Sequence, residues 1–185
     1  MISRFNANTA MMRDSCVNIG AHCGENNSDD EIDQIWDAIQ FVAYLTGVDH
    51  RFILAVMLQE SGGCVRVRAT GNGSTNPGLM QSHNGQYTCN RNSELLNPCP
   101  ASHIFGMIND GVGGTGDGDG LAGALNKVAT CDDGRQYYKA ARQYNSGSIP
   151  DETRLEIAGF STACYASDIA NRLTGWVMAP AECHL

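Results

Sequence analysis

The sequence predicts a mainly α-helical protein that folds as a single domain over residues 1–185. Apolar residues recur at helical spacing in several segments, helix-capping residues precede two of them, and no segment shows the sustained alternation of an exposed strand. Apolar residues make up 42% of the chain and charged residues 17%, a composition that excludes disorder. The length suffices for one sizeable core, and neither a repeat nor a linker marks a second domain.

Residues 1–27 are polar and are expected to form an irregular segment that packs on the domain. Ser28 and Glu31 have the spacing of a capping box, so a helix should begin there, and Gly47 should end it. Further helices are expected at about residues 101–110, 121–128, 134–144 and 161–176, the last with Tyr165, Ile169 and Leu173 aligned, and residues 62–100 should be mostly loop with room for short β segments.

The segment 49–63 predicts a buried helix that ends in a carboxylate. Asp49 caps it, seven consecutive apolar residues follow at 52–58, and Glu60 lies just before a pair of glycines. On a helix, Glu60 shares a face with apolar residues three, four and seven positions earlier. Such surroundings disfavour the charged carboxylate and raise its pKa, as a general acid in glycoside cleavage requires.

Eight dispersed cysteines predict four disulfides and an oxidising, extracellular location. The start of the chain lacks the pattern of a signal peptide, so we expect a mature secreted form. A net charge of −8 argues against nucleic acid as a partner, and no apolar run is long enough for a membrane span. The cysteines are Cys16, Cys23, Cys64, Cys89, Cys99, Cys131, Cys164 and Cys183, and their pairing cannot be read from the sequence.

Three short motifs follow one another in the chain: Glu60-Ser61, Gly78-Leu79-Met80-Gln81 and the segment 141–147, ARQYNSG. Together they resemble the signature of soluble lytic transglycosylases and goose-type lysozymes, glycoside hydrolase family 23. The similar region covers residues 49–147, about half of the chain. The unmatched ends, with the eight cysteines, look like a secreted fungal branch of that family.

The resemblance implies an α+β lysozyme-like fold with a groove for a β-1,4-linked amino-sugar polymer. It implies that Glu60 is the general acid and that Ser61 orients Glu60 or binds sugar nearby. Met80 would pack in the loop that lines the groove, and Gln81 would donate a hydrogen bond to substrate.

The third motif and one histidine complete the implied site. Tyr144 would hold the catalytic carboxyl group by a hydrogen bond, and Asn145 would contact sugar. His83, two residues after Gln81, is a further candidate for substrate contact because it adjoins the second motif.

The sequence departs from the family in the region where goose-type lysozymes place aspartates near the second motif. His83 stands there, and no second carboxylate is supplied nearby. Hydrolysis uses such a group, whereas a lytic transglycosylase does not, because a hydroxyl of the substrate closes an anhydro ring. A secreted enzyme has no evident need for that product, so hydrolysis is favoured. Candidate second carboxylates, which the sequence does not rank, are Asp110, Asp117, Asp119, Asp132 and Asp133.

The segment 111–120, GVGGTGDGDG, is expected to be a flexible loop. It lacks the ligand spacing of an EF-hand or a calcium-binding repeat, and the five histidines show no ligand spacing either. We therefore expect neither a metal nor a cofactor.

The favoured function is that of a secreted, monomeric muramidase that cleaves the MurNAc–GlcNAc bonds of peptidoglycan. Three alternatives stay open: a lytic transglycosylase, a chitinase or chitosanase on the same fold, and a non-catalytic protein that binds cell walls.

Overall fold

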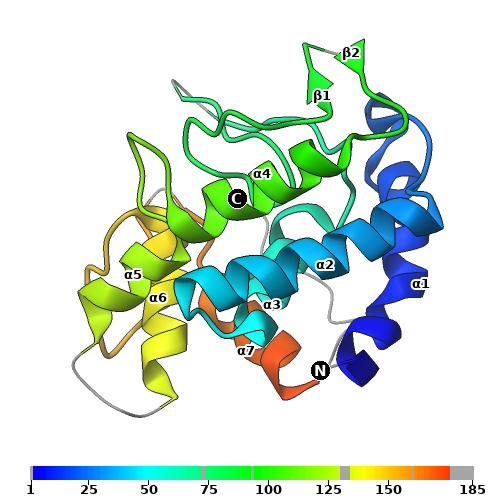
Figure 1. The fold of residues 1–185 in the computed structure, drawn as a ribbon. Helices are drawn as coiled ribbons and strands as arrows, with labels where there is room; N and C mark the ends of the chain where they lie inside the picture. Colours follow the sequence, from blue (N-terminus) through cyan, green and yellow to red (C-terminus); the bar gives the residue numbers. More distant parts are fainter. Residues whose placement is uncertain (1, 72–73, 93, 130–133, 160, 176–185) are drawn as a thin grey trace.

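The computed structural model describes residues 2–71, 74–92, 94–129, 134–159 and 161–175, and these form a mainly helical structure (Figure 1). They contain seven α-helices, one short 3-10 helix and one two-stranded antiparallel sheet. The elements are α1 (Ile2–Ile19), η1 (Ala21–Cys23), α2 (Asp29–Thr46), α3 (His50–Ser61), β1 (Asn90–Arg91), β2 (Glu94–Leu95), α4 (Ala101–Gly113), α5 (Leu121–Val128), α6 (Arg135–Ser146) and α7 (Tyr165–Thr174).

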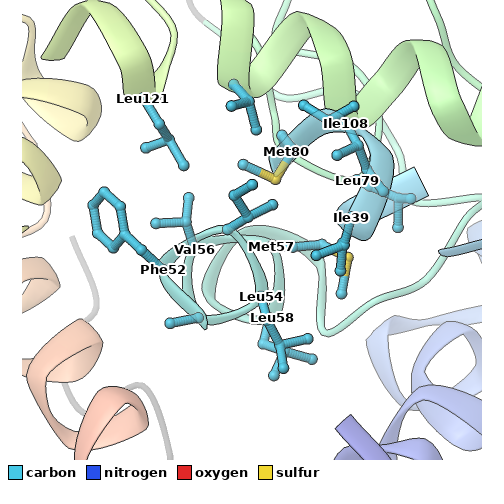
Figure 2. Packing of buried hydrophobic residues seen from close by; sticks show 14 of the residues in the cluster. Ile39, Phe52, Leu54, Val56, Met57, Leu58, Leu79, Met80, Ile108 and Leu121 are labelled. Carbon is cyan, nitrogen blue, oxygen red and sulfur yellow. The ribbon is translucent and has the colours of Figure 1, made fainter. Parts of the chain in front are cut away.

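Helix α3 lies at the centre of the fold. It packs against α2 on one side and α7 on the other, while α2 also packs against α4. Every residue from Phe52 to Leu58 is buried, and this run faces Ile39 of α2, Ile108 of α4 and the buried pair Leu79 and Met80 (Figure 2). Burial on all sides of α3 explains why its apolar residues are consecutive rather than periodic.

Helix α2 begins and ends as its sequence predicts. The Ser28 hydroxyl accepts a hydrogen bond from the Glu31 N–H, and the Glu31 carboxylate accepts one from the Ser28 N–H, which completes the capping box. Gly47 ends the helix in the left-handed conformation, with φ 71°. Glu31 is buried, and it also pairs with the buried guanidinium group of Arg66 at 2.5 Å.

Residues 2–19 correct one prediction, because this polar stretch forms helix α1 rather than an irregular segment. Its buried positions include Phe5, Met12 and Cys16, which recur at helical spacing, but the polar residues Asn8 and Ser15 lie buried among them. This face therefore did not read as apolar in the sequence.

The remaining elements differ little from their predicted ranges. Helix α4 runs three residues beyond its predicted end and α7 is shorter than predicted, with Trp176 outside the described residues. The short strands β1 and β2 lie in the 62–100 segment, where Asn90 pairs with Leu95. None of the described helices combines the length and apolar character that crossing a membrane requires.

The cysteines only partly follow the prediction of four disulfides. Cys16 bonds to Cys64 and Cys89 bonds to Cys99, and Cys164 is also disulfide-bonded. Cys23 is instead a buried free thiol, so the prediction is wrong for this residue. It packs against Cys16 and Cys64, whose sulfurs are already joined to each other. Cys131 and Cys183 lie outside the described residues.

Candidate active site

Helix α3 delivers Glu60 to the edge of the core. The Asp49 carboxylate accepts a hydrogen bond from the Arg51 N–H and so caps the start of the helix. Gly62 ends it in the left-handed conformation, with φ 58°. Glu60 lies in the last turn of α3, at the negative end of the helix dipole, where a charged carboxylate is disfavoured.

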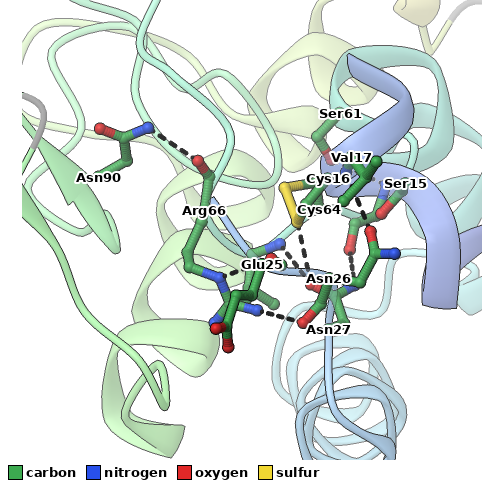
Figure 3. Close-up of a disulfide and its surroundings, with 12 residues drawn as sticks. Ser15, Cys16, Val17, Glu25, Asn26, Asn27, Ser61, Cys64, Arg66 and Asn90 are labelled. Carbon is green, nitrogen blue, oxygen red and sulfur yellow. Dashed lines mark hydrogen bonds between the residues drawn. A yellow bond between two sulfur atoms is a disulfide. The ribbon is translucent and has the colours of Figure 1, made fainter. Parts of the chain in front are cut away.

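The chain just after Glu60 is held firmly in place. The Cys16–Cys64 disulfide joins it to α1, and the buried side chain of Asn27 donates to the Gly63 carbonyl at 2.7 Å and accepts from the Val65 N–H at 3.1 Å (Figure 3). The Arg66 guanidinium group adds bonds to the carbonyls of residues 25 and 26 (Figure 3). These bonds restrict movement of the end of α3 and therefore hold Glu60 in place.

The Glu60 carboxyl group is largely withdrawn from water, and Tyr165 is its hydrogen-bond partner among the described residues. The Tyr165 hydroxyl donates a hydrogen bond to Glu60 Oε1 at 2.5 Å. Burial raises the pKa of Glu60 from 4.5 to about 7, and the Tyr165 hydrogen bond opposes that rise by stabilising the carboxylate. A substantial fraction of Glu60 is thus protonated at neutral pH, as the sequence led us to expect.

Tyr165, and not Tyr144, is the tyrosine that holds this carboxyl group. The Tyr144 hydroxyl donates to the Met80 carbonyl at 2.7 Å, so the role expected for it belongs to a different residue. Burial is the first cause that raises the pKa of both phenols, so both remain neutral hydrogen-bond donors. Tyr144 instead ties helix α6 to the second motif.

Helix α7 is fixed against α3 by a polar chain around Gln59. The Gln59 amide donates to Asp168 at 3.1 Å and accepts from Arg172 at 2.9 Å. These bonds set the position of Tyr165 at the start of α7 relative to Glu60 at the end of α3. The sequence spacing of Tyr165 with Ile169 and Leu173 indicated a core role, and nothing in it connects Tyr165 with a carboxylate 105 residues away.

Glu60 opens onto a groove of about 830 Å³. All three motifs contribute to its walls, as do the loop between α4 and α5 and the segment before α7. The lining residues are Glu60, Thr70, Gly71, Asn76, Gln81, His83, Asp117, Gly118, Asp119, Gln143, Tyr144, Asn145, Ser146, Gly147, Ser161 and Thr162.

Gln81 lines the groove, but its side chain is committed to the protein. Its oxygen accepts from the Thr70 hydroxyl at 2.7 Å, and its nitrogen donates to the carbonyls of Gly78 at 3.0 Å and Arg68 at 3.3 Å. The expected donation to substrate would require these bonds to break. Gln81 therefore joins two loops of the groove wall.

Ser61 and Met80 are also structural rather than substrate-binding. The Ser61 hydroxyl donates to the Met57 carbonyl at 3.0 Å and accepts from the Gly63 N–H at 3.1 Å, which satisfies the end of α3. Met80 is fully buried, consistent with its expected packing, and its side chain is closed to substrate. Neither side chain is therefore free to bind substrate as it stands: the Ser61 hydroxyl is bonded to backbone groups at the end of α3, and Met80 packs in the core.

His83 and Asn145 keep positions from which they can reach a ligand. His83 is exposed on the groove wall. Asn145 also lines the groove, and its oxygen accepts a hydrogen bond from Arg142. That buried arginine donates further to the Thr162 carbonyl at 2.9 Å, so it fixes Asn145 against the segment before α7.

The candidate second carboxylates differ in whether they line the groove. Asp117 and Asp119 line the groove with Glu60. Asp110 does not; its carboxylate accepts from the Gln86 N–H at 2.8 Å, and burial raises its pKa. Asp132 and Asp133 lie outside the described residues. Among the described residues, no group of three or more His, Cys, Asp or Glu side chains is placed to hold a metal ion.

Comparisons of the chain with protein-family models, with curated proteins and with solved structures found no match. The motifs in the sequence and the chemistry of the groove are therefore the basis for assigning a function.

Proposed function

We propose that this protein is a secreted glycoside hydrolase, a muramidase that cleaves β-1,4 MurNAc–GlcNAc bonds of peptidoglycan with Glu60 as the general acid. The observation that carries the proposal is a carboxyl group with a pKa of about 7 that lines a groove of about 830 Å³. The order of the three motifs and the mainly helical fold support it. The disulfides are compatible with secretion.

In this mechanism, protonated Glu60 gives its proton to the glycosidic oxygen as the bond to the sugar carbon breaks. Tyr165 holds the carboxyl group through its hydrogen bond to Glu60 Oε1, which leaves Oε2 as the oxygen that would carry the transferred proton. Because Glu60 must carry a proton to act, activity should fall as the pH rises through about 7.

The direct test is the clearing of a bacterial cell suspension by the parent protein and by Glu60→Gln. Loss of the transferable proton should lower the rate about 10³-fold. Glu156→Gln is the matched control, because that glutamate is exposed and pairs with Arg154 outside the groove. Equal clearing by Glu60→Gln and the parent would exclude Glu60 as the acid.

One observation favours chitosan over chitin as a second candidate substrate. The described residues that line the groove include the acidic residues Glu60, Asp117 and Asp119 but no Lys or Arg. The stem peptides of peptidoglycan carry carboxylates, which this groove would repel, while the amino groups of chitosan are cationic. Release of soluble sugar from chitosan, at a rate that falls with added salt, would favour this substrate over peptidoglycan.

The remaining alternatives are separated by the products. Mass spectrometry of the fragments distinguishes hydrolysis, which leaves reducing ends, from transglycosylation, which leaves 1,6-anhydro ends. Tight binding of cell-wall fragments without turnover would instead indicate a non-catalytic binding protein.

A further inference from the structure

We propose that Asp117 is the second catalytic carboxylate and takes a proton from the water that attacks the sugar. This inference rests on the proposed glycoside hydrolase function. The sequence alone did not indicate which carboxylate has this role. With Asp117 as the base, the expected reaction is hydrolysis with inversion at the anomeric carbon.

Asp117 is the best placed of the described candidates. It lines the same groove as Glu60 and comes from a separate segment of the chain, the loop between α4 and α5. Asp119 is engaged in an ion pair with Lys127, and Asp110 caps the Gln86 N–H away from the groove. Asp117 is also exposed, so water can reach its carboxylate.

The loop that carries Asp117 is closely packed, in contrast to the flexibility expected from its glycines. The Thr115 N–H donates to the Gly118 carbonyl at 2.9 Å, and the Thr115 hydroxyl donates to the His83 carbonyl at 2.7 Å. A Cβ atom at Gly118 would lie 2.9 Å from the Cβ of His83, and one at Gly120 would lie 2.3 Å from the nitrogen of Gly114. The glycines thus allow close contact between backbone segments.

A side chain outside the loop orients the carboxylate. The Asn84 amide donates to Asp117 Oδ2 at 3.3 Å. Asn84 is itself held by its backbone N–H, which donates to the Thr75 carbonyl at 2.7 Å, and by the Thr75 N–H, which donates to its side-chain oxygen at 3.3 Å. No described residue donates a hydrogen bond to Asp117 Oδ1, and we assign the proton transfer from water to this oxygen.

The step balances with water as the only co-reactant. Asp117 removes one proton from water while the water oxygen forms a bond to the anomeric carbon. The bond from that carbon to the glycosidic oxygen breaks, and Glu60 supplies the proton to the leaving oxygen. Asp117 ends protonated and Glu60 ends ionised, and exchange with solvent restores both. Inverting enzymes place their two carboxyl groups about 6.5–9.5 Å apart to leave room for this water.

The test compares Asp117→Asn with Asp119→Asn on purified peptidoglycan and on chitosan, using whichever the parent protein cleaves. We expect Asp117→Asn to lower kcat about 10²–10³-fold with KM changed by less than about threefold. The Asp119 variant, which removes an equal charge two residues away, should lose far less. Thermal melting of both variants shows that they fold.

Two further readouts distinguish a catalytic base from a structural residue. Azide needs no deprotonation to attack, so it should restore cleavage by Asp117→Ala with an α-glycosyl azide as product. NMR of the first product from the parent protein should show the α anomer.

An Asp117→Asn variant within about threefold of the parent, a β anomer formed first, or anhydro products would each overturn the assignment of Asp117. A fully active Glu60→Gln variant would overturn the proposed function itself. An inactive Glu60→Gln variant with an active Asp117→Asn variant would overturn only the inference about Asp117.

Discussion

Glu60 and Asp117 reach the same groove from regions of very different construction. Glu60 ends a buried helix, and a disulfide and a buried ion pair fix the chain that follows it. Asp117 lies in segment 114–120, where four of the seven residues are glycines and the carboxylate is exposed. The first region withdraws its carboxyl group from water, and the second leaves its carboxylate exposed.

This difference shows how one groove can hold an acid and a base at the same pH. Withdrawal from water favours the protonated form of Glu60, which suits a proton donor. Asp117 is exposed and accepts a hydrogen bond from the Asn84 amide, and in the proposed mechanism it takes the proton of the attacking water.

The contribution of the disulfide that anchors the chain after Glu60 can be tested by removing each disulfide separately. The Cys16–Cys64 bond spans 48 residues and the Cys89–Cys99 bond spans 10. Chain-entropy arguments give losses of about 4 and about 3 kcal/mol in the free energy of unfolding. Replacing both cysteines of each pair by serine, with denaturant unfolding as the measurement, should show this order. If loss of the first pair costs less than loss of the second, the disulfide beside α3 is not the stronger anchor.

The apolar setting of Glu60 should be visible as a pH dependence of stability. The folded protein holds the Glu60 proton more tightly than the unfolded chain, so this contribution to stability is full below pH 4.5 and is lost as the pH rises through about 7. Glu60→Gln does not titrate. Urea unfolding at pH 4 and pH 8 should show the variant gaining on the parent by about 3 kcal/mol. A difference that does not change with pH would mean that Glu60 is not withdrawn from water.

The close packing of the Asp117 loop can be tested with two of its glycines, which differ in backbone conformation and in the space around them. Gly114 has φ 93°, and an added Cβ would lie 2.8 Å from the Gly118 oxygen, whereas a Cβ at Gly116 meets nothing within 4 Å. Gly114→Ala should lower stability by about 1–3 kcal/mol and reduce activity, while Gly116→Ala should stay within about 0.5 kcal/mol. Equal melting temperatures would indicate that the loop is not held as described.

Replacing either tyrosine by phenylalanine should have the smallest effect, a change in the pH dependence of activity that differs between Tyr165 and Tyr144. The Tyr165 hydrogen bond stabilises ionised Glu60, so Tyr165→Phe should raise the pKa of Glu60 further and move the upper limit of the activity–pH profile up by about one unit. Tyr144→Phe should leave that limit in place, because Tyr144 donates to the Met80 carbonyl. The reverse result would return the role to Tyr144, as the sequence first indicated.

The sequence was most informative where local chemistry decides the structure. The capping box at Ser28, the cap at Asp49 and the left-handed glycines at 47 and 62 set the limits of α2 and α3, and the structure has them where they were expected. It was least informative for α1, because that helix buries the polar side chains of Asn8 and Ser15 on its packed face. The residue that holds α1 to the chain after α3 was not predictable either: the buried Asn27 donates to the carbonyls of Met12 and Gly63.

The candidate site shows the same division. The apolar residues just before Glu60 in the sequence predicted that its pKa is raised. The partner Tyr165 comes from another helix and was not. Gln81 and Ser61 were placed near Glu60 correctly, but only the fold reveals that their polar groups are already bonded within the protein.

The free thiol of Cys23 has a consequence for thiol–disulfide exchange. It belongs to the same buried cluster as the Cys16–Cys64 bond, the bridge that anchors α3. Exchange requires a thiolate, and burial raises the pKa of Cys23, which keeps the thiol protonated at neutral pH. The native bridge is therefore protected from isomerising for as long as this cluster stays closed, and local opening would expose it to shuffling.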